Sequence, residues 1–150
     1  MARLPIDSPI ASDSPYTFMS WAPSPVVMSP LDGIMRVVAD SDLDGLMAAA
    51  VLKASKPEME IHFAHPALLR MGNIDHLIDR NTAICDLPFH PDCGLYLDHH
   101  LTNRPSPEEQ VVFEQKGGIC HWRDTPSAAR AAYDLLKDEF NNGLHALEII

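Results

Sequence analysis

Seven aspartate and histidine residues gather in three short segments of the sequence. They are Asp40, Asp42 and Asp44 in "VADSDLDG", Asp86 in "AICD", and Asp98, His99 and His100 in "YLDHH". Carboxylates this close in sequence repel one another unless a cation lies between them. Oxygen ligands combined with imidazole suit Mn²⁺, Mg²⁺ or Fe²⁺ better than a soft metal bound by thiolates. The residue types therefore predict a site for hard divalent cations.

Each of the three segments follows an apolar run that is typical of a buried strand. We expect strands at 34–39, 59–65, 82–86 and 94–98, an edge strand at 110–115, and helices at 44–55, 71–80 and 125–140. Strands that alternate with helices predict an α/β fold with a mainly parallel β-sheet and helices on both faces. The carboxyl ends of parallel strands lie on one edge of the sheet, and ligands bind there. The three segments should therefore converge.

The first acidic segment offers two local expectations. In an extended segment, alternate side chains point to the same side, so Asp40, Asp42 and Asp44 would face one ligand. Asp44 or a neighbour can also cap the helix that follows. Pro126 lies in the expected first turn of the last helix, and "NNG" at 141–143 is its expected stop signal.

The composition limits the possible partners. The net charge is −10, with 11 Lys and Arg against 21 Asp and Glu, and no basic run exists. Binding of duplex nucleic acid by charge neutralisation is therefore disfavoured. A bound cation would change the local sign, so an anionic substrate is compatible with this charge. The absence of a long apolar run, a signal peptide and a Cys-x-x-Cys pair predicts a cytoplasmic protein without a membrane partner.

The chain divides into two parts by composition. Residues 1–33 hold six of the 13 prolines and many serines, and they predict a disordered leader. Residues 34–150 carry the strand and helix patterns of one α/β domain.

The first acidic segment partly matches two known local motifs. The calcium loop of an EF-hand matches "DSDLDG", but Val51 stands where its glutamate belongs, and the preceding segment is a predicted strand. The signature of haloacid-dehalogenase-like phosphatases, Asp-x-Asp-Gly-Thr, resembles "DLDGL" with Leu46 in place of the threonine. The latter interpretation makes Asp42 a nucleophile and gives no function to the Asp-His-His segment, but it stays an alternative.

The segments taken together resemble the DHH phosphoesterase superfamily. "VVADSDLDGLMAAAVL" is similar to motif I of RecJ-type single-strand nucleases, "AICD" to motif II, and "LYLDHHLTN" to the Asp-His-His motif III. "DTPSAARAAYDLL" is similar to the helix that follows in the nanoRNase branch, so the resemblance covers about residues 34–142.

The resemblance implies a function and a role for each motif residue. It implies hydrolysis of phosphodiester or phosphoanhydride bonds in nucleotides, short single-stranded oligonucleotides or related small phosphates, by two Mn²⁺ or Mg²⁺ ions. A homodimer is a separate expectation. The implied metal ligands are Asp40, Asp42, Asp44, Asp86 and His99. His100 would face the substrate phosphate and Asp98 would orient a histidine. Asn103, Arg104 and the amides around Ser127 would contact phosphate.

The resemblance also implies parts that should follow Ile150. These are a fourth metal-binding motif and a small C-terminal domain that grips the substrate, so we expect residues 34–150 to be the incomplete front domain of such a protein. A non-catalytic module that binds metal or nucleotide is therefore a second hypothesis.

Overall fold

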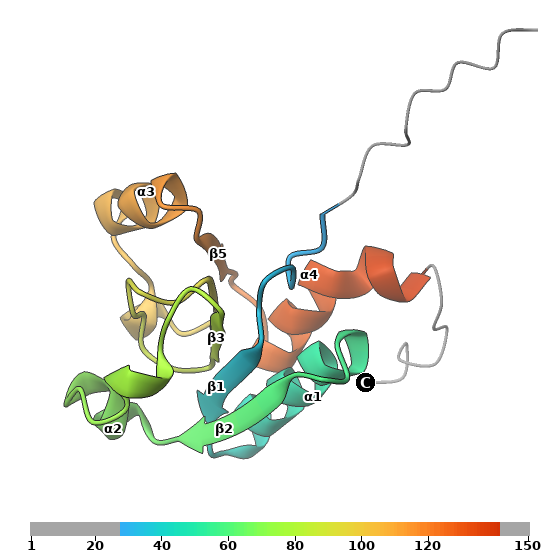
Figure 1. Cartoon of the computed structure of the whole chain (residues 1–150), viewed down its shortest axis with the longest axis horizontal. Helices are drawn as coiled ribbons and strands as arrows, with labels where there is room; N and C mark the ends of the chain where they lie inside the picture. Colours follow the sequence, from blue (N-terminus) through green and yellow to red (C-terminus); the bar gives the residue numbers. More distant parts are fainter. Residues whose placement is uncertain (1–27, 142–150) are drawn as a thin grey trace, which may run out of the picture.

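A computed structural model describes residues 28–141 of the chain (Figure 1). The elements are β1 (Arg36–Asp40), α1 (Leu43–Ser55), β2 (Glu60–Ala64), α2 (Pro66–Arg70), β3 (Thr82–Cys85), β4 (Leu95–Asp98), α3 (Pro107–Gln115), β5 (Ile119–Trp122) and α4 (Ala128–Asn141). Two single-turn 3₁₀ helices, Asp75–Leu77 and Leu101–Asn103, lie in the connections. None of the helices between residues 28 and 141 combines the length and apolarity that a bilayer crossing requires.

The five strands form one sheet in the order β2-β1-β3-β4-β5, and every pair is parallel. The α/β prediction is therefore confirmed. The chain passes from β1 to β2 on one side and then returns to place β3 on the other side of β1. Such a change of direction leaves a crevice at the carboxyl ends of the two central strands, where ligands bind in open α/β sheets. Asp40 ends β1 and Asp86 follows β3, so the acidic segments flank this point.

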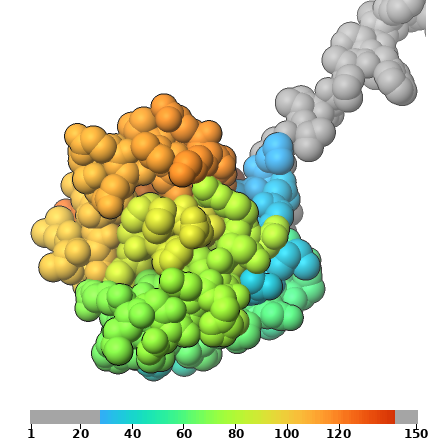
Figure 2. Space-filling view, turned by 60° about the vertical axis from the view of Figure 1, so that its left-hand side comes forward, coloured from blue at the N-terminus to red at the C-terminus, as the bar shows by residue number. Residues whose placement is uncertain are grey.

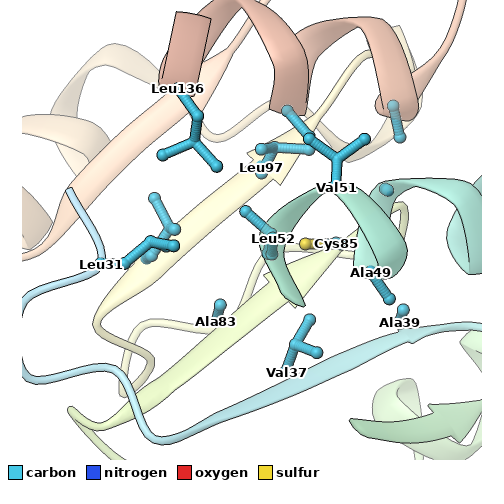
Figure 3. Close-up of a cluster of buried hydrophobic side chains, with 14 of the residues drawn as sticks. Leu31, Val37, Ala39, Ala49, Val51, Leu52, Ala83, Cys85, Leu97 and Leu136 are labelled. Atoms are coloured by element: carbon cyan, nitrogen blue, oxygen red, sulfur yellow. The ribbon is translucent and has the colours of Figure 1, made fainter. Parts of the chain in front are cut away.

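Helices cover both faces of the sheet, as predicted. On one face, α1 and α4 lie side by side (Figure 1), and their alanine and leucine side chains pack on alternate residues of β1, β3 and β4 (Figure 3). On the other face, α2, α3 and the connection after β3 pack on the intervening residues, among them Val38, Ile84 and Tyr96. Figure 2 shows the surface formed by the green to orange segments, from β2 to the end of α3.

The predicted edge strand at 110–115 is wrong, because this segment belongs to α3. Ser106 and Glu109 form a capping box, and Pro107 occupies the first turn. These start signals outweigh the strand preference of the two valines, since a cap stabilises a helix by about 1 kcal/mol and the β preference is a weaker bias. The strand at this edge of the sheet is β5, with β2 at the opposite edge, and the sequence did not reveal β5.

The predicted helix at 71–80 is also wrong. Helix α2 begins earlier, at Pro66, and has His65 as its N-cap. Gly72 has a φ of +73°. This left-handed conformation ends the helix. The chain continues through turns and one 3₁₀ turn to β3.

Residues 1–27 of the expected leader lie outside the described residues, as do Asn142 and Gly143 of the stop signal. Within 28–33 the chain already packs against the domain. Leu31 is buried in the core, and the Ser29 hydroxyl donates a hydrogen bond to Glu139 on α4. The packed part of the chain therefore begins before Ile34.

Candidate metal centre

The strand ends bring most of the predicted acidic and imidazole residues together. Ligand atoms of Asp86, Asp98, His99 and His100 all lie within 4.8 Å of one another, and the same holds for Asp40, Asp42 and Asp86. Asp86 belongs to both groups. We call these six residues the Asp-His cluster. Its donor atoms, carboxylate oxygens and imidazole nitrogens, are suitable ligands for a divalent cation.

Asp86 is a buried carboxylate whose oxygens lack hydrogen bonds within the described part of the chain. It is 2% exposed, and neither of its carboxylate oxygens has a hydrogen-bond partner among residues 28–141. Burial, with the negative charges of Asp44, Asp42 and Asp98, raises the pKa of Asp86 to about 8. Asp86 also has a φ of +59°, a strained conformation that concentrates at functional sites. Buried carboxylates are normally hydrogen-bonded, paired or metal-bound, so this unsatisfied group fits a cation site.

His99 lies between two carboxylates. Its Nδ1 is 3.1 Å from the carbonyl oxygen of Thr125, and its Nε2 is 3.1 Å from Asp44 Oδ2 and 3.6 Å from Asp86 Oδ1. The carbonyl can only accept, so we assign the proton to Nδ1. The Nε2 lone pair then faces negative oxygens. This arrangement fits a shared cation, because metal-binding histidines commonly donate their other N–H to a carbonyl.

Asp98 is fully buried but, unlike Asp86, it is well satisfied. Its Oδ1 accepts from the His99 and His100 amides and lies 2.9 Å from His100 Nδ1. Its Oδ2 accepts from the Tyr96 hydroxyl at 3.1 Å and from Asn103 Nδ2 at 2.8 Å. These bonds fix the carboxylate against the ring of His100, which is the arrangement expected of a residue that orients a histidine.

Asp98 also influences the titration of His100. Burial acts to lower the pKa of His100, but the hydrogen bond to Asp98 and the negative charges of Asp98, Asp86 and Asp44 outweigh it, so the pKa is raised. The His100 side chain is about half exposed. One edge of the ring is thus held by the protein while part of it stays accessible to a ligand.

The first acidic segment is not extended to Asp44, so the expected alternation is wrong. The strand ends at Asp40, and Asp42 is the N-cap of α1, accepting from the Gly45 amide at 2.9 Å. Asp44 lies in the first turn of α1, and its carboxylate accepts from the Ala128 and Ala129 amides at 2.9 and 3.1 Å. Asp44 thereby joins the starts of α1 and α4 and still reaches His99.

The three predicted phosphate contacts all have partners within the protein. Asn103 donates to Asp98, and the guanidinium of Arg104 stacks 4.4 Å from the centre of the Trp122 ring. Ser127 Oγ accepts from the Arg130 amide, while the next two amides of α4 donate to Asp44. A phosphate at this helix start would have to displace a carboxylate.

Three supporting residues were absent from the sequence prediction. Tyr96 donates to Asp98, Trp122 Nε1 donates to the His100 carbonyl at 2.9 Å, and Thr125 provides the carbonyl beside His99. The spacing of Tyr96 and Asp98 contained a signal, because residues two apart on a strand share a face. Nothing local in the sequence marks the other two, which depend on β5.

A comparison with protein-family models gives no match, and a comparison with curated proteins gives none either. Among solved structures, the chain is similar to a pGpG-specific phosphodiesterase, PggH from Vibrio cholerae, with 30% sequence identity and a TM-score of 0.47. The match covers 66% of this chain and 28% of that one. The chain thus corresponds to less than a third of that structure.

Proposed function

We propose that this chain is the metal-binding domain of a phosphoesterase that hydrolyses phosphodiester or phosphoanhydride bonds of nucleotides or short oligonucleotides. The main observation behind the proposal is Asp86, a buried carboxylate that lies among the five other side chains of the Asp-His cluster and has no hydrogen-bond partner among the described residues. The resemblance of the three motifs to the DHH phosphoesterases supports the same assignment.

The residues that would hold divalent cations divide between two groups that share Asp86. One group adds Asp40 and Asp42 to Asp86, and the other includes His99, whose Nε2 lies 3.6 Å from Asp86 Oδ1. Asp44 reaches His99 from the start of α1. Bound Mn²⁺ or Mg²⁺ would supply Lewis acidity toward a phosphate oxygen and a lowered pKa for a water molecule.

His100 is the proposed proton donor to the leaving oxygen. Its Nδ1 lies 2.9 Å from the Asp98 carboxylate, so Nδ1 holds its proton there and Nε2 remains for the substrate. The hydrogen bond to Asp98 and the nearby negative charges raise the pKa of His100, which favours its protonated form. General acid catalysis of this kind contributes about 10²–10⁴ in rate. Arg104, held against Trp122, is the nearby cation proposed to contact a phosphate.

The test is hydrolysis of bis(p-nitrophenyl) phosphate and of a diadenylate with 5′-phosphate, each with and without Mn²⁺. We expect turnover that requires Mn²⁺, disappears with a chelator and disappears in Asp86→Asn. The exposed Asp92→Asn is the matched control, because it removes the same charge away from the cluster and should leave turnover intact.

Other results would favour the alternatives. Mn²⁺ binding without turnover of either substrate would favour the non-catalytic module. Trapping of a metal fluoride or a phosphoryl group on Asp42 would favour the haloacid-dehalogenase-like phosphatase. Turnover that survives both the chelator and Asp86→Asn would contradict the proposed function.

A further inference from the structure

An apolar hollow lies directly beside the acidic end of β1. It has a volume of about 320 Å³, and its walls are Ser41, Asp42, Leu43, Leu46 and Phe63. The three apolar side chains are unusually accessible, since Leu43 is 73%, Leu46 is 48% and Phe63 is 46% exposed. The Asp-His cluster and the hollow share one residue, Asp42.

Backbone pairing fixes this hollow relative to the cluster. In the β1–β2 register Phe63 pairs with Ala39, and the Ser41 amide donates to the Ala64 carbonyl at 3.2 Å. Ala39 packs in the core beneath α1, so Phe63 extends toward the same face. The ring of Phe63 therefore lies beside the first turn of α1, whose Leu43 and Leu46 complete the apolar wall.

We propose that this hollow is a subsite for the nucleobase of a ligand whose phosphate lies at the Asp-His cluster. The inference rests on the proposed function for its phosphate anchor and adds a recognition element for the base. An aromatic ring and two aliphatic side chains present flat apolar surface, which is what a base requires for stacking. Ser41 and Asp42 line the polar part of the hollow, on the side of the metal-binding residues.

The charge of the chain favours this occupant over a lipid surface. The net charge is −10, and the hollow is bordered by Asp42, with Asp40 and Asp44 close in sequence. An anionic membrane would be repelled. A nucleotide would not be, because its negative charge is confined to the phosphate, at which the cations would lie, while its base is neutral.

The experiment compares two ligands that differ only in the base. The affinities of AMP and ribose 5-phosphate are measured by calorimetry in the presence of Mn²⁺, for the wild-type chain and three variants. We expect AMP to bind about 5- to 100-fold more tightly than ribose 5-phosphate, the range of a stacked base. Phe63→Ala should bring this ratio close to one, and Phe63→Trp should retain it.

Val111→Ala is the matched control. Val111 is 52% exposed on α3, on the opposite face of the sheet, and its truncation should leave the affinity ratio unchanged. Thermal unfolding of each variant verifies that it is folded. Equal affinities for the two ligands in the wild type, a ratio that Phe63→Ala does not change, or no binding of either ligand would overturn the subsite.

A second copy of the chain is the competing occupant, because β2 is an edge strand. A dimer that Phe63→Ala dissociates would assign the hollow to that contact and overturn the proposal. The proposed function can fail separately. Tighter binding of AMP than of ribose 5-phosphate without any hydrolysis would contradict the proposed enzymatic function but support the nucleobase subsite. Mn²⁺-dependent hydrolysis with equal affinities for the two ligands would contradict the subsite alone.

Discussion

Two buried carboxylates at neighbouring strand ends have opposite environments. Asp98 accepts hydrogen bonds from Tyr96, Asn103 and the residues that follow it, whereas the side chain of Asp86 accepts none from the part of the chain that the structure describes. Because its oxygens are hydrogen-bonded, the Asp98 carboxylate can hold the ring of His100 in a fixed position. An unsatisfied one is costly to ionise in the folded chain unless a cation binds to it. The sequence identified both residues as site candidates, but the hydrogen-bond partners that distinguish them depend on tertiary structure.

At the scale of single residues, we expect Asp86→Asn to change how stability depends on pH. The pKa of Asp86 is raised to about 8, so between about pH 4 and pH 8 the folded chain holds a proton that the unfolded chain has lost. Without metal, the stability of the wild type should therefore fall across this window relative to Asp86→Asn, by up to on the order of 5 kcal/mol. Asparagine also tolerates the positive φ better than alanine does.

Urea unfolding with a chelator present, from pH 5 to pH 8.5, measures this difference. Asp92→Asn serves as the control and should follow the wild type. Parallel curves for the wild type and Asp86→Asn would show that Asp86 has an ordinary environment in the folded chain.

His100→Gln should separate catalysis from metal binding. We expect kcat to fall by about 10²-fold or more, because the proposed proton donor is lost, while Mn²⁺ affinity changes little. Steady-state kinetics and calorimetry measure the two effects. The exposed His76→Gln is the matched control. Equal losses of Mn²⁺ affinity in His100→Gln and in a His99→Gln variant would contradict the division of roles between the two histidines.

At the scale of elements, the sequence predicted the parts that depend on buried apolar runs. β1, β3 and β4 are such runs, and the acidic residues follow them, so their convergence could be inferred from strand geometry alone. The segment from α3 to β5 was not predicted, because the strand preference of its two valines was given more weight than the capping box of α3. In addition, β5 is not a fully buried apolar run like β3 and β4. As a result Trp122, which contacts both His100 and Arg104, was missed.

The junction of β1 and α1 leads to an element-scale prediction at Gly45. A Cβ at this position would lie 2.2 Å from the Asp40 carbonyl oxygen and 2.7 Å from the Asp40 amide nitrogen, so the helix start would have to shift. We expect Gly45→Ala to destabilise the fold by about 2 kcal/mol or more and to weaken Mn²⁺ binding. In an unconstrained helix the same change would stabilise by roughly 1 kcal/mol.

Thermal unfolding and Mn²⁺ calorimetry of Gly45→Ala provide the test. Ala50→Gly, at an exposed position of the same helix, is the control. It should lower the stability of the fold only by the difference in helix propensity between alanine and glycine, and it should leave Mn²⁺ binding intact. A stabilised Gly45→Ala variant would show that α1 does not need this close approach to hold Asp42.

At the scale of the whole molecule, the acidic cluster makes stability depend on cations. Because the unfolded chain lacks the assembled cluster, metal bound only to the folded state adds about 2.7 kcal/mol at a concentration 100 times the Kd. For a domain of this size we expect Mn²⁺ to raise Tm by roughly 10 °C. Differential scanning calorimetry with Mn²⁺ or chelator measures the shift. An equal shift in Asp86→Asn would assign it to general surface binding.

The most direct test of the account is anomalous diffraction from crystals grown with Mn²⁺. We expect anomalous density at the carboxyl end of the sheet, within about 2.2 Å of an Asp86 oxygen and His99 Nε2. A second peak is expected at Asp86 together with Asp42 or Asp40. Density only at other positions, or none at saturating Mn²⁺ with Asp86 still unpaired, would contradict the claim that these strand ends form a cation site.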